Sequence, residues 1–373
     1  MKILHLIDSG GLYGAEKMLL SLVAGQVEQG LYPMILSAGE PEVGEKPLEA
    51  EARRLGLPVT TWRMKPGINL REASRIIQWA LQEGYDLLHS HGYKFNVLVG
   101  IWPARMRLPL VTTLHGYVHA PRFSKMWLYE LLDRFMLFRT QAVVLVNEGM
   151  KAELGRALRG AGRVHVIPNG VDVSNIEACA RADLPAEITS FLQDHSPVVL
   201  GVGRLSGEKG FDRLIEAFAV LRKQHVEAGL LIVGEGKLRK ELEALVRRHS
   251  LERSVLMPGY YENVPALMAR SSALAIPSRT EGLPITILEA MATGLPIIAS
   301  AVGAIPKALD HGRGGIVIEE LDAQRLAIGL CECFSNTPEA NLKAERAIDK
   351  VQKDYSSSAM TREYTRIYQK VIA

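Results

Sequence analysis

The chain has few cysteines, no long apolar run and no dense tract of one charge, and each absence excludes a class of protein. Its three cysteines, Cys179, Cys331 and Cys333, offer one Cys-x-Cys pair, which is neither a zinc site nor a disulfide framework. A typical apolar run, residues 142–146, is far shorter than the roughly 20 residues that span a bilayer. Asp8 interrupts the apolar start, which therefore lacks the core of a signal peptide. We expect a cytoplasmic protein that does not cross a membrane.

Charge is close to balanced, with a formal net charge of +3. Residues 1–168 hold 20 of the 44 Lys and Arg but only 15 of the 41 Asp and Glu, so the first half is the more basic. This excess is too small and too dispersed to predict a nucleic-acid partner. It is compatible with an anionic acceptor or a lipid surface.

Length and patterning predict two domains of α/β class. A chain of 373 residues exceeds the size of one ordinary core, and apolar β-branched runs alternate with segments of helical period in both halves. We expect strands at 3–7, 34–37, 87–90, 110–114, 142–146, 164–167, 198–202, 230–233, 255–257, 273–277, 297–300 and 315–318. The pattern indicates two doubly wound, Rossmann-like domains that face each other across a cleft. A turn-forming Pro-Asn-Gly and a weakly periodic polar segment place the join between Pro168 and Ser196, which gives domains 1–172 and 173–356.

In each half, one glycine-containing loop follows the first predicted strand. Gly10 and Gly11 precede an apolar helix and can bring backbone amides to an anion, although close packing also explains glycine there. Gly203 lies in a loop that carries Arg204 and Lys209, and two cations before a helix suit a diphosphate. The alternative for this second loop is a solvated basic turn.

Residues 280–296, TEGLPITILEAMATGLP, carry the most informative pattern. Pro284 at the first helical position predicts a helix to about Thr293, which leaves the amides of residues 283–286 free toward the cleft. Glu281 and Glu289 would repel phosphate, so hydroxyls of a ribose or a pyranose are their expected partners. The alternative for Glu281 is a favourable charge near a helix N-terminus. The candidate nucleotide-sugar ligands in this stretch are Glu281, Gly282, Leu283, Pro284, Ile285 and Glu289.

Three histidines lie at predicted strand ends of the first half. His115 follows the strand at 110–114, where a neutral imidazole could contact a sugar, although such a residue is also common in loops and caps. His89 and His91 alternate on one strand. With no third ligand candidate nearby, we interpret them as structural or acceptor-side residues and not as metal ligands.

Taken together, these motifs resemble the family-4 (group 1) retaining glycosyltransferases of the GT-B fold over nearly the whole chain. The Glu-x7-Glu signature is matched by Glu281 and Glu289, the family's cations by Arg204 and Lys209, its glycine loop by Gly10 and Gly11, and its cleft histidine by His115. The turn at 169–172 and Gly234-Glu235-Gly236 are also similar to family segments.

The resemblance implies a metal-independent hexosyltransferase that uses a UDP- or GDP-linked sugar and retains the anomeric configuration. It implies that Arg204 and Lys209 hold the diphosphate, that Glu281 lies near the sugar hydroxyls and that Glu289 binds the ribose. The implied catalytic residues are His115, Arg204, Lys209 and Glu281. It further implies that the last helix, residues 357–373, packs back on the N-terminal domain. No Asp-x-Asp motif occurs in the sequence, so we expect no metal and no other cofactor.

The resemblance assigns the acceptor, a glycan or a lipid-linked molecule, to the N-terminal domain. Candidate acceptor-side residues are Tyr13, Gly14, Lys94, Tyr117 and His119. Residues 121–139 mix aromatic side chains with Arg122, Lys125, Arg134 and Arg139, which is compatible with a helix at the inner face of a membrane. The alternative is an ordinary core helix that buries Trp127, Leu128, Leu131, Leu132 and Phe135.

Two other functions stay open on the sequence. A nucleotide-sugar epimerase or a phosphorylase can use a similar scaffold, although the sequence offers no identifiable phosphate or pyridoxal site for a phosphorylase. A non-catalytic nucleotide-sugar-binding subunit could also keep the fold. The transferase is favoured because the sequence contains all four residues of the expected donor site, Arg204, Lys209, Glu281 and Glu289. We expect it to act in bacterial polysaccharide or glycolipid assembly.

Overall fold

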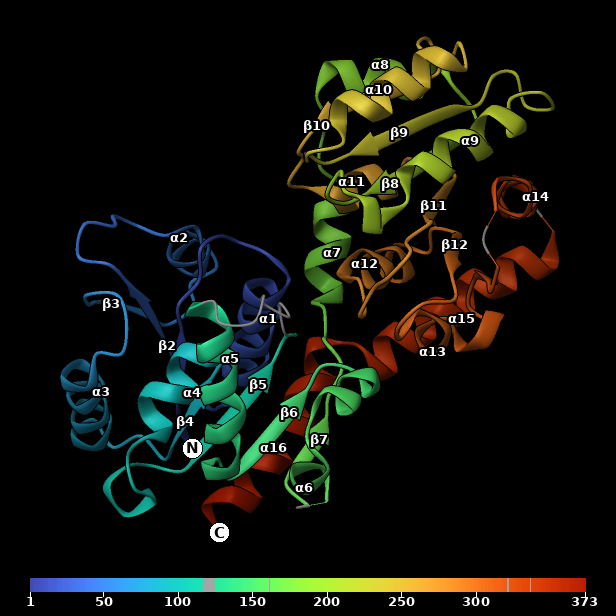
Figure 1. Ribbon diagram of the computed structural model, residues 1–373. Helices are drawn as coiled ribbons and strands as arrows, with labels where there is room; N and C mark the ends of the chain where they lie inside the picture. Colours follow the sequence, from blue (N-terminus) through green and yellow to red (C-terminus); the bar gives the residue numbers. More distant parts are fainter. Residues whose placement is uncertain (117–124, 161, 321, 336) are drawn as a thin grey trace. The chain divides into compact units, whose positions relative to one another are not determined.

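A computed structural model describes residues 1–116, 125–160, 162–320, 322–335 and 337–373 (Figure 1). The chain forms two compact units, one of residues 1–170 with 357–373 and the other of residues 171–356. Each unit is an α/β structure around one parallel sheet, which confirms the predicted class. Among the described residues no helix is both long and apolar enough to cross a bilayer.

The first unit contains a seven-stranded sheet in the order β3-β2-β1-β4-β5-β6-β7, with every neighbouring pair parallel. Its strands are β1 Lys2–Ile7, β2 Tyr32–Gly39, β3 Val59–Arg63, β4 Leu87–Ser90, β5 Leu110–Leu114, β6 Ala142–Leu145 and β7 Val164–Val166. Strand β3 was not among the predicted strands. This edge strand reads VTTWR and is only partly buried, so it lacks the apolar run that marks the inner strands.

Helices cover this sheet, and the last one comes from the far end of the chain. They are α1 Gly14–Glu28, α2 Pro47–Arg54, α3 Leu70–Gln82, α4 Tyr93–Gly100, α5 Lys125–Met136, α6 Arg156–Arg159 and α16 Ser357–Ile372, with short 3-10 turns η1 Ala104–Met106, η2 Leu137–Arg139 and η3 Glu148–Glu153. Helix α16 packs against α1 (Figure 1). It buries Met360, Tyr364, Ile367 and Tyr368, which recur at helical spacing.

The second unit contains a six-stranded parallel sheet in the order β10-β9-β8-β11-β12-β13. Its strands are β8 Val198–Val202, β9 Gly229–Val233, β10 Val255–Gly259, β11 Ala273–Ile276, β12 Ile297–Ser300 and β13 Ile316–Ile318. Its helices are α7 Val173–Ala180, α8 Ala186–Asp194, α9 Phe211–Leu221, α10 Arg239–Arg248, α11 Val264–Met268, α12 Ile285–Thr293, α13 Ile305–Ala308, α14 Ala323–Phe334 and α15 Pro338–Asp354, with 3-10 turns η4 Gly207–Lys209 and η5 Asp310–Gly312. The polar segment between Pro168 and Ser196 therefore contains two helices, α7 and α8, which its weak periodicity did not predict.

Apolar cores lie on both faces of the second sheet. In β8, Val198 and Leu200 belong to one buried cluster while Val199 belongs to the other, because successive side chains of a strand point to opposite faces. Strands covered on both faces need continuous apolar runs, and this is why they were visible in the sequence. The strand order reverses at β8, whose neighbours are β9 and β11. The loops that follow β8 and β11 therefore lie side by side at the carboxyl edge, the usual ligand position in such sheets.

Helix α5 differs from the core helix that the apolar residues of 121–139 allowed. Leu128, Leu131 and Phe135 are 52%, 50% and 64% exposed, so the core interpretation is wrong for these three residues. The buried side chains of this helix include Glu130 and Asp133 instead.

Candidate functional site

Backbone contacts fix the glycine loop that follows β8 in the second unit. The amide of Gly203 donates to the carbonyl of Val233 over 3.0 Å, and the amide of Leu205 donates to the carbonyl of Glu235 over 3.0 Å. Gly234 has φ +144°, and a Cβ at this residue would lie 1.9 Å from the carbonyl oxygen of Gly203. Only glycine fits there, and the loop carrying Gly203 is thereby held against the end of β9.

Lys209 is positioned at the opposite side of the same loop. It ends η4 and precedes Gly210, whose φ of +69° begins α9 in a left-handed conformation. A Cβ on Gly210 would lie 2.2 Å from the carbonyl oxygen of Pro277, so this turn is pressed against the chain that leaves β11. Arg279 adds a clamp, because its guanidinium donates to the carboxylate of Asp212 over 2.9 and 2.6 Å. Arg279 and Asp212 were not among the predicted site residues.

The structure brings Lys209 and Glu281 into direct contact. The Nζ of Lys209 lies 2.5 Å from Oε1 of Glu281, and the hydroxyl of Ser278 donates to the same oxygen over 2.8 Å. The two charged side chains are 25% and 11% exposed. An ammonium group has three donors, and Glu281 occupies one of them, so Lys209 keeps donors for an anion.

Arg204 shares its loop with Lys209 and remains exposed. The pKa of Glu208 is lowered first by hydrogen bonds from Ser206 and from its own backbone, and further by the positive charges of Arg204 and Lys209. Both cations therefore act on the same small volume at the end of β8. Such a volume suits a diphosphate.

The start of α12 lies beside this cation pair in the chain that follows β11. Pro284 is its N-cap with ψ 131°, and the helix begins at Ile285, one residue later than predicted. No side chain caps this helix start, so its first amides are available to an anion. Glu289 lies inside α12 and is 8% exposed, and Leu283 is equally buried.

The loop after β12 packs against the backbone of Glu281 and Gly282. Gly303 has φ +58°, and a Cβ there would lie 2.0 Å from the carbonyl oxygen of Glu281. The amide of Ala304 donates to the carbonyl of Gly282 over 2.8 Å. Glycine at position 303 is therefore required by this close approach, which fixes the position of the Glu281 loop.

At the carboxyl edge of the first unit, one carboxylate holds two lysines. The Nζ atoms of Lys94 and Lys46 lie 2.5 and 2.8 Å from the two carboxylate oxygens of Asp8. Burial raises the pKa of Asp8, but hydrogen bonds from Lys46 and Lys94 together lower it by more, and the net shift is downward. This cluster of two lysines and one aspartate has an excess of positive charge.

Packing does not require glycine in the loop of the first unit. A Cβ on Gly10 would meet nothing within 4 Å, whereas a Cβ on Gly11 would lie 2.5 Å from the ring of Tyr13. The amide of Tyr13 is used locally, because it donates to Oε2 of Glu16 at the start of α1, where Gly14 is the first residue. Tyr13 itself is 68% exposed. Space alone thus gives no reason for glycine at position 10.

His115 follows β5 at the same edge. Burial lowers its pKa to about 4, so the imidazole is neutral at physiological pH. Its Nε2 is buried and has no hydrogen-bond partner in the described part of the chain. The ring stacks on His91 with centroids 5.8 Å apart. A neutral imidazole with an unpaired nitrogen can bind a hydroxyl.

The expectation that His89 and His91 lack a third histidine nearby is wrong. His5 on β1 pairs in register with His89 on β4, and its Nδ1 lies 3.0 Å from Nε2 of His91. The candidate ligand nitrogens of the three buried residues all lie within 4.8 Å of one another, a spacing that could hold a metal ion.

Hydrogen bonds already occupy most of this histidine cluster. His5 contacts Gln26 over 2.8 Å, and His89 contacts Tyr368 over 2.7 Å and Thr113 over 2.8 Å. Among the ring nitrogens of these three histidines, only Nδ1 of His91 lacks a partner within the described residues. The geometry is therefore that of an internal network tying β1, β4, β5 and α16 together.

The candidate residues divide by their place in the structure. Tyr117 and His119 lie outside the described residues. The remaining candidates fall into two groups, one at the carboxyl edge of each sheet. The second group, which the sequence analysis assigned to a nucleotide sugar, includes Gly203, Arg204, Lys209, Glu281, Gly282, Leu283, Pro284, Ile285 and Glu289.

Two family models together match most of the chain. Residues 188–354 match the glycosyl transferases group 1, and residues 13–175 match the glycosyltransferase family 4. N-acetyl-alpha-D-glucosaminyl L-malate synthase of Bacillus anthracis is 26% identical over 310 residues, 82% of this chain and 80% of that protein. UDP-Gal:alpha-D-GlcNAc-diphosphoundecaprenol alpha-1,3-galactosyltransferase of Escherichia coli is 28% identical over 263 residues, 68% of this chain and 66% of that protein.

Solved structures share the fold over the whole chain. HepE of Anabaena in complex with UDP has a TM-score of 0.81 at 23% identity, covering 99% of this chain and 100% of HepE. A glycosyltransferase from Rickettsia africae has a TM-score of 0.78 at 21% identity, covering 100% of this chain and 98% of its own. These likenesses confirm the predicted GT-B type of fold, with two Rossmann-like parallel-sheet domains.

Proposed function

Because the chain belongs to the group 1, family 4 glycosyltransferases, we propose that it moves a sugar from a UDP- or GDP-linked donor to a glycan or lipid-linked acceptor. The observation that carries this proposal is the contact between Lys209 and Glu281, 2.5 Å long, between the loops that follow β8 and β11. It joins a cation suited to diphosphate with a carboxylate suited to sugar hydroxyls at the position where the strand order reverses.

The donor is assigned to the second unit. Arg204 and Lys209 bind the diphosphate, with the amides at the uncapped start of α12 and Gly203 close to its oxygens. Glu281 accepts hydrogen bonds from the sugar, and Glu289 accepts them from the ribose. HepE has been solved with UDP and with UDP-glucose, and the Escherichia coli relative uses UDP-Gal, which supports a nucleotide sugar as the donor.

The reaction breaks the bond between the anomeric carbon and the diphosphate. Negative charge then develops on the departing phosphate oxygen, and Arg204 and Lys209 stabilise it without the carboxylates that would hold a divalent ion. The acceptor hydroxyl attacks on the same face, forms the new glycosidic bond and loses its proton to the leaving diphosphate, so the anomeric configuration is retained. Glu281 and its bond to Lys209 orient the cation. His115 is neutral at physiological pH, and its imidazole is suited to a sugar hydroxyl.

The acceptor is assigned to the carboxyl edge of the first unit, where Lys94 and Lys46 exceed the charge of Asp8. Tyr13 and Gly14 begin α1 at this edge. We place the reaction in bacterial polysaccharide or glycolipid assembly in the cytoplasm, at the inner face of the membrane. The diphosphoundecaprenol-linked substrate named for the Escherichia coli relative supports a lipid-linked acceptor.

A donor panel tests the function. The protein is incubated with UDP- and GDP-sugars, with and without candidate acceptors, in buffer with EDTA, and the release of nucleoside diphosphate is measured. Release with one donor, lowered by about two to three orders of magnitude in Lys209→Ala and kept in the exposed-lysine control Lys223→Ala, supports a metal-independent transferase. Formation of an epimeric nucleotide sugar without release would favour an epimerase. Thermal stabilisation by a nucleotide sugar without any turnover would favour a binding subunit.

A further inference from the structure

Helix α5 buries acidic side chains and exposes apolar ones. It buries the carboxylates of Glu130 and Asp133, which are 5% and 0% exposed, and the amide nitrogen of Asn96 on α4 donates to Asp133 over 2.7 Å. Its outward face carries Leu128, Leu131 and Phe135 instead. A helix that faces water normally shows the opposite arrangement, so this outward face is built for a partner other than water.

The apolar face continues beyond the helix into η2. Phe138, 47% exposed, follows Leu128, Leu131 and Phe135 at spacings of three, four and three residues, which place all four on one side of the helix axis. We call Leu128, Leu131, Phe135 and Phe138 the apolar stripe. Helix α5 has 12 residues and is about 18 Å long, and the stripe covers most of this length and continues into η2.

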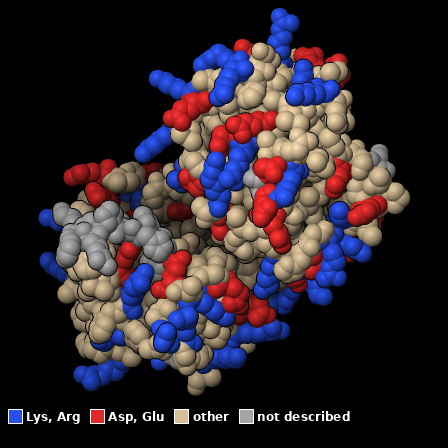
Figure 2. Space-filling model, turned by 45° about the vertical axis from the view of Figure 1, so that its right-hand side comes forward, with Lys and Arg blue, Asp and Glu red and all other residues tan. Residues whose placement is uncertain are grey.

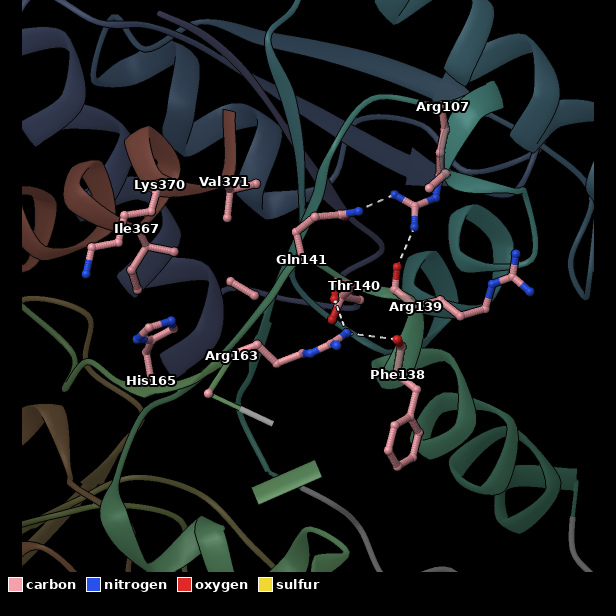
Figure 3. A pocket seen from close by; sticks show the side chains of 13 residues that line it. Arg107, Phe138, Arg139, Thr140, Gln141, Arg163, His165, Ile367, Lys370 and Val371 are labelled. Carbon is pink, nitrogen blue, oxygen red and sulfur yellow. Dashed lines mark hydrogen bonds between the residues drawn. The ribbon is translucent and has the colours of Figure 1, made fainter. Parts of the chain in front are cut away.

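A basic pocket adjoins the end of the stripe. It lies at the amino edge of β5, β6 and β7, has a volume of about 730 Å³ and includes Phe138 in its wall (Figure 3). Its charged lining residues are Arg107, Arg139, Arg163 and Lys370, with His165 beside Lys370. Among the described residues that line it there is no Asp or Glu. The pocket is at the opposite edge of the sheet from His115 and Lys94, so it is separate from the candidate active site.

The cations of this pocket have no counter-charge among the described residues. Arg107 donates to the carbonyl of Leu108. It also donates to the carbonyl of Arg139, and Arg163 donates to the carbonyls of Phe138 and Thr140 (Figure 3). The pKa of Arg107 is lowered to about 10, first by burial and then by the charge of Arg139.

On the face drawn in Figure 2, Lys and Arg are interspersed with Asp and Glu. An acid-free cluster of four cations next to an exposed apolar stripe differs from that pattern. It is complementary to one kind of surface, in which anionic phosphate groups lie next to acyl chains.

We propose that the apolar stripe and the basic pocket dock this protein on an anionic phospholipid membrane. Leu128, Leu131, Phe135 and Phe138 enter the boundary between headgroups and acyl chains, and the pocket binds a headgroup phosphate through Arg139 and Lys370 at its exposed rim. The docking surface deepens the proposed function and rests on it. Helix α5 follows β5 at the acceptor-side edge and leads back to the start of the parallel strand β6, so the stripe joins that edge to the pocket at the amino edge. The membrane would then lie along this side of the first unit, and a lipid-linked acceptor resides in such a membrane.

Vesicle sedimentation tests the docking surface with the full chain and without any donor. Vesicles of phosphatidylcholine alone are compared with vesicles that also contain phosphatidylglycerol. We expect binding to the anionic vesicles only, weakened about fivefold for each cation removed in Arg139→Gln and Lys370→Gln. Leu131→Gln and Phe135→Gln should each weaken it by about tenfold. Thermal melting checks that every variant is folded.

Matched controls come from exposed residues of the second unit. Lys223→Gln with Lys240→Gln removes two charges, and Val226→Gln with Ile328→Gln removes two exposed apolar side chains. Both controls should bind as the parent does. Equal binding by all variants, or no binding to anionic vesicles, would overturn the proposal. So would stripe-dependent self-association, or capture of glycerol phosphate without vesicle binding. Failure of the proposed transferase activity would leave this result unchanged, because vesicle binding requires no turnover.

Discussion

Mild acid should destabilise the first unit through its buried histidines. Burial lowers the pKa of His5 and of His115 to about 4, whereas an unfolded histidine has a pKa near 6.5. Between these values the unfolded chain binds more protons than the folded one, so the free energy of unfolding falls as the pH falls. The pKa values of His89 and His91 are lowered too, first by burial and then by neighbouring histidines, and they act in the same direction.

The size of the effect follows from the two pKa values. Between pH 8 and pH 5, one histidine with a folded pKa of about 4 lowers the free energy of unfolding by about 2 kcal/mol. His5 and His115 together give about 4 kcal/mol, which moves a urea midpoint by about 2 M at an m-value of about 2 kcal/mol/M. The lowered pKa of Asp8 adds acid sensitivity only at lower pH, because a carboxylate loses its stabilising charge below about pH 4.

Tryptophan fluorescence can measure this unit alone. All four tryptophans, Trp62, Trp79, Trp102 and Trp127, belong to the first unit. Urea unfolding followed at pH 8 and pH 5 should show the loss, and His5→Asn should reduce the pH-dependent part by about 2 kcal/mol whatever its effect at pH 8. His249→Asn, an exposed change in the other unit, serves as the control. A midpoint independent of pH, or an unchanged pH dependence in His5→Asn, would refute the reasoning.

Three further predictions concern the second unit. Lys209→Ala should lower turnover by about two to three orders of magnitude, measured as nucleoside diphosphate release, because it removes a charge aimed at the leaving group; Lys223→Ala is its control. Gly303→Ala should displace the Glu281 loop, since its Cβ would lie 2.0 Å from a carbonyl oxygen. Calorimetry should then show weaker nucleotide-sugar binding, and this loss of binding free energy should exceed the loss of unfolding free energy measured by thermal melting. Arg279 also donates to the carbonyl of Gly207 in η4 over 2.7 Å, so Arg279→Ala should free η4 and raise KM for the donor, with a smaller change in kcat. An unchanged KM would show that the clamp does not position Lys209.

The inner strands of both sheets were predictable because burial on both faces requires continuous apolar runs. The edge strand β3 is only partly buried, so it does not need a continuous apolar run. Its sequence VTTWR contains none. Helix α5 shows a different limit. Leu128 and Leu131 recur at helical spacing, but so do Glu130 and Asp133, and period alone does not say which of two faces packs inward.

The candidate site divides in the same way. Spacing singled out Lys209 and Glu281 as separate ligands, while their contact depends on which loops the strand order brings together. His5 was missed because it lies within the apolar run of β1, far from His89 in sequence. The parallel register of β1 and β4 is what places the two residues opposite each other. A histidine inside an apolar strand is the signal that could have found it.

Helix α16 sets an order for biosynthesis. Residues 171–356 form the second unit from one unbroken stretch, which can fold as soon as it leaves the ribosome. The first unit is synthesised earlier but waits for Tyr364 and Tyr368, which fill its core and bond to Thr113 and His89. The domain that starts first is therefore completed last. Until then its unfinished face is open to chaperones, and a shortened carboxyl end would disable the amino-terminal domain and spare its neighbour.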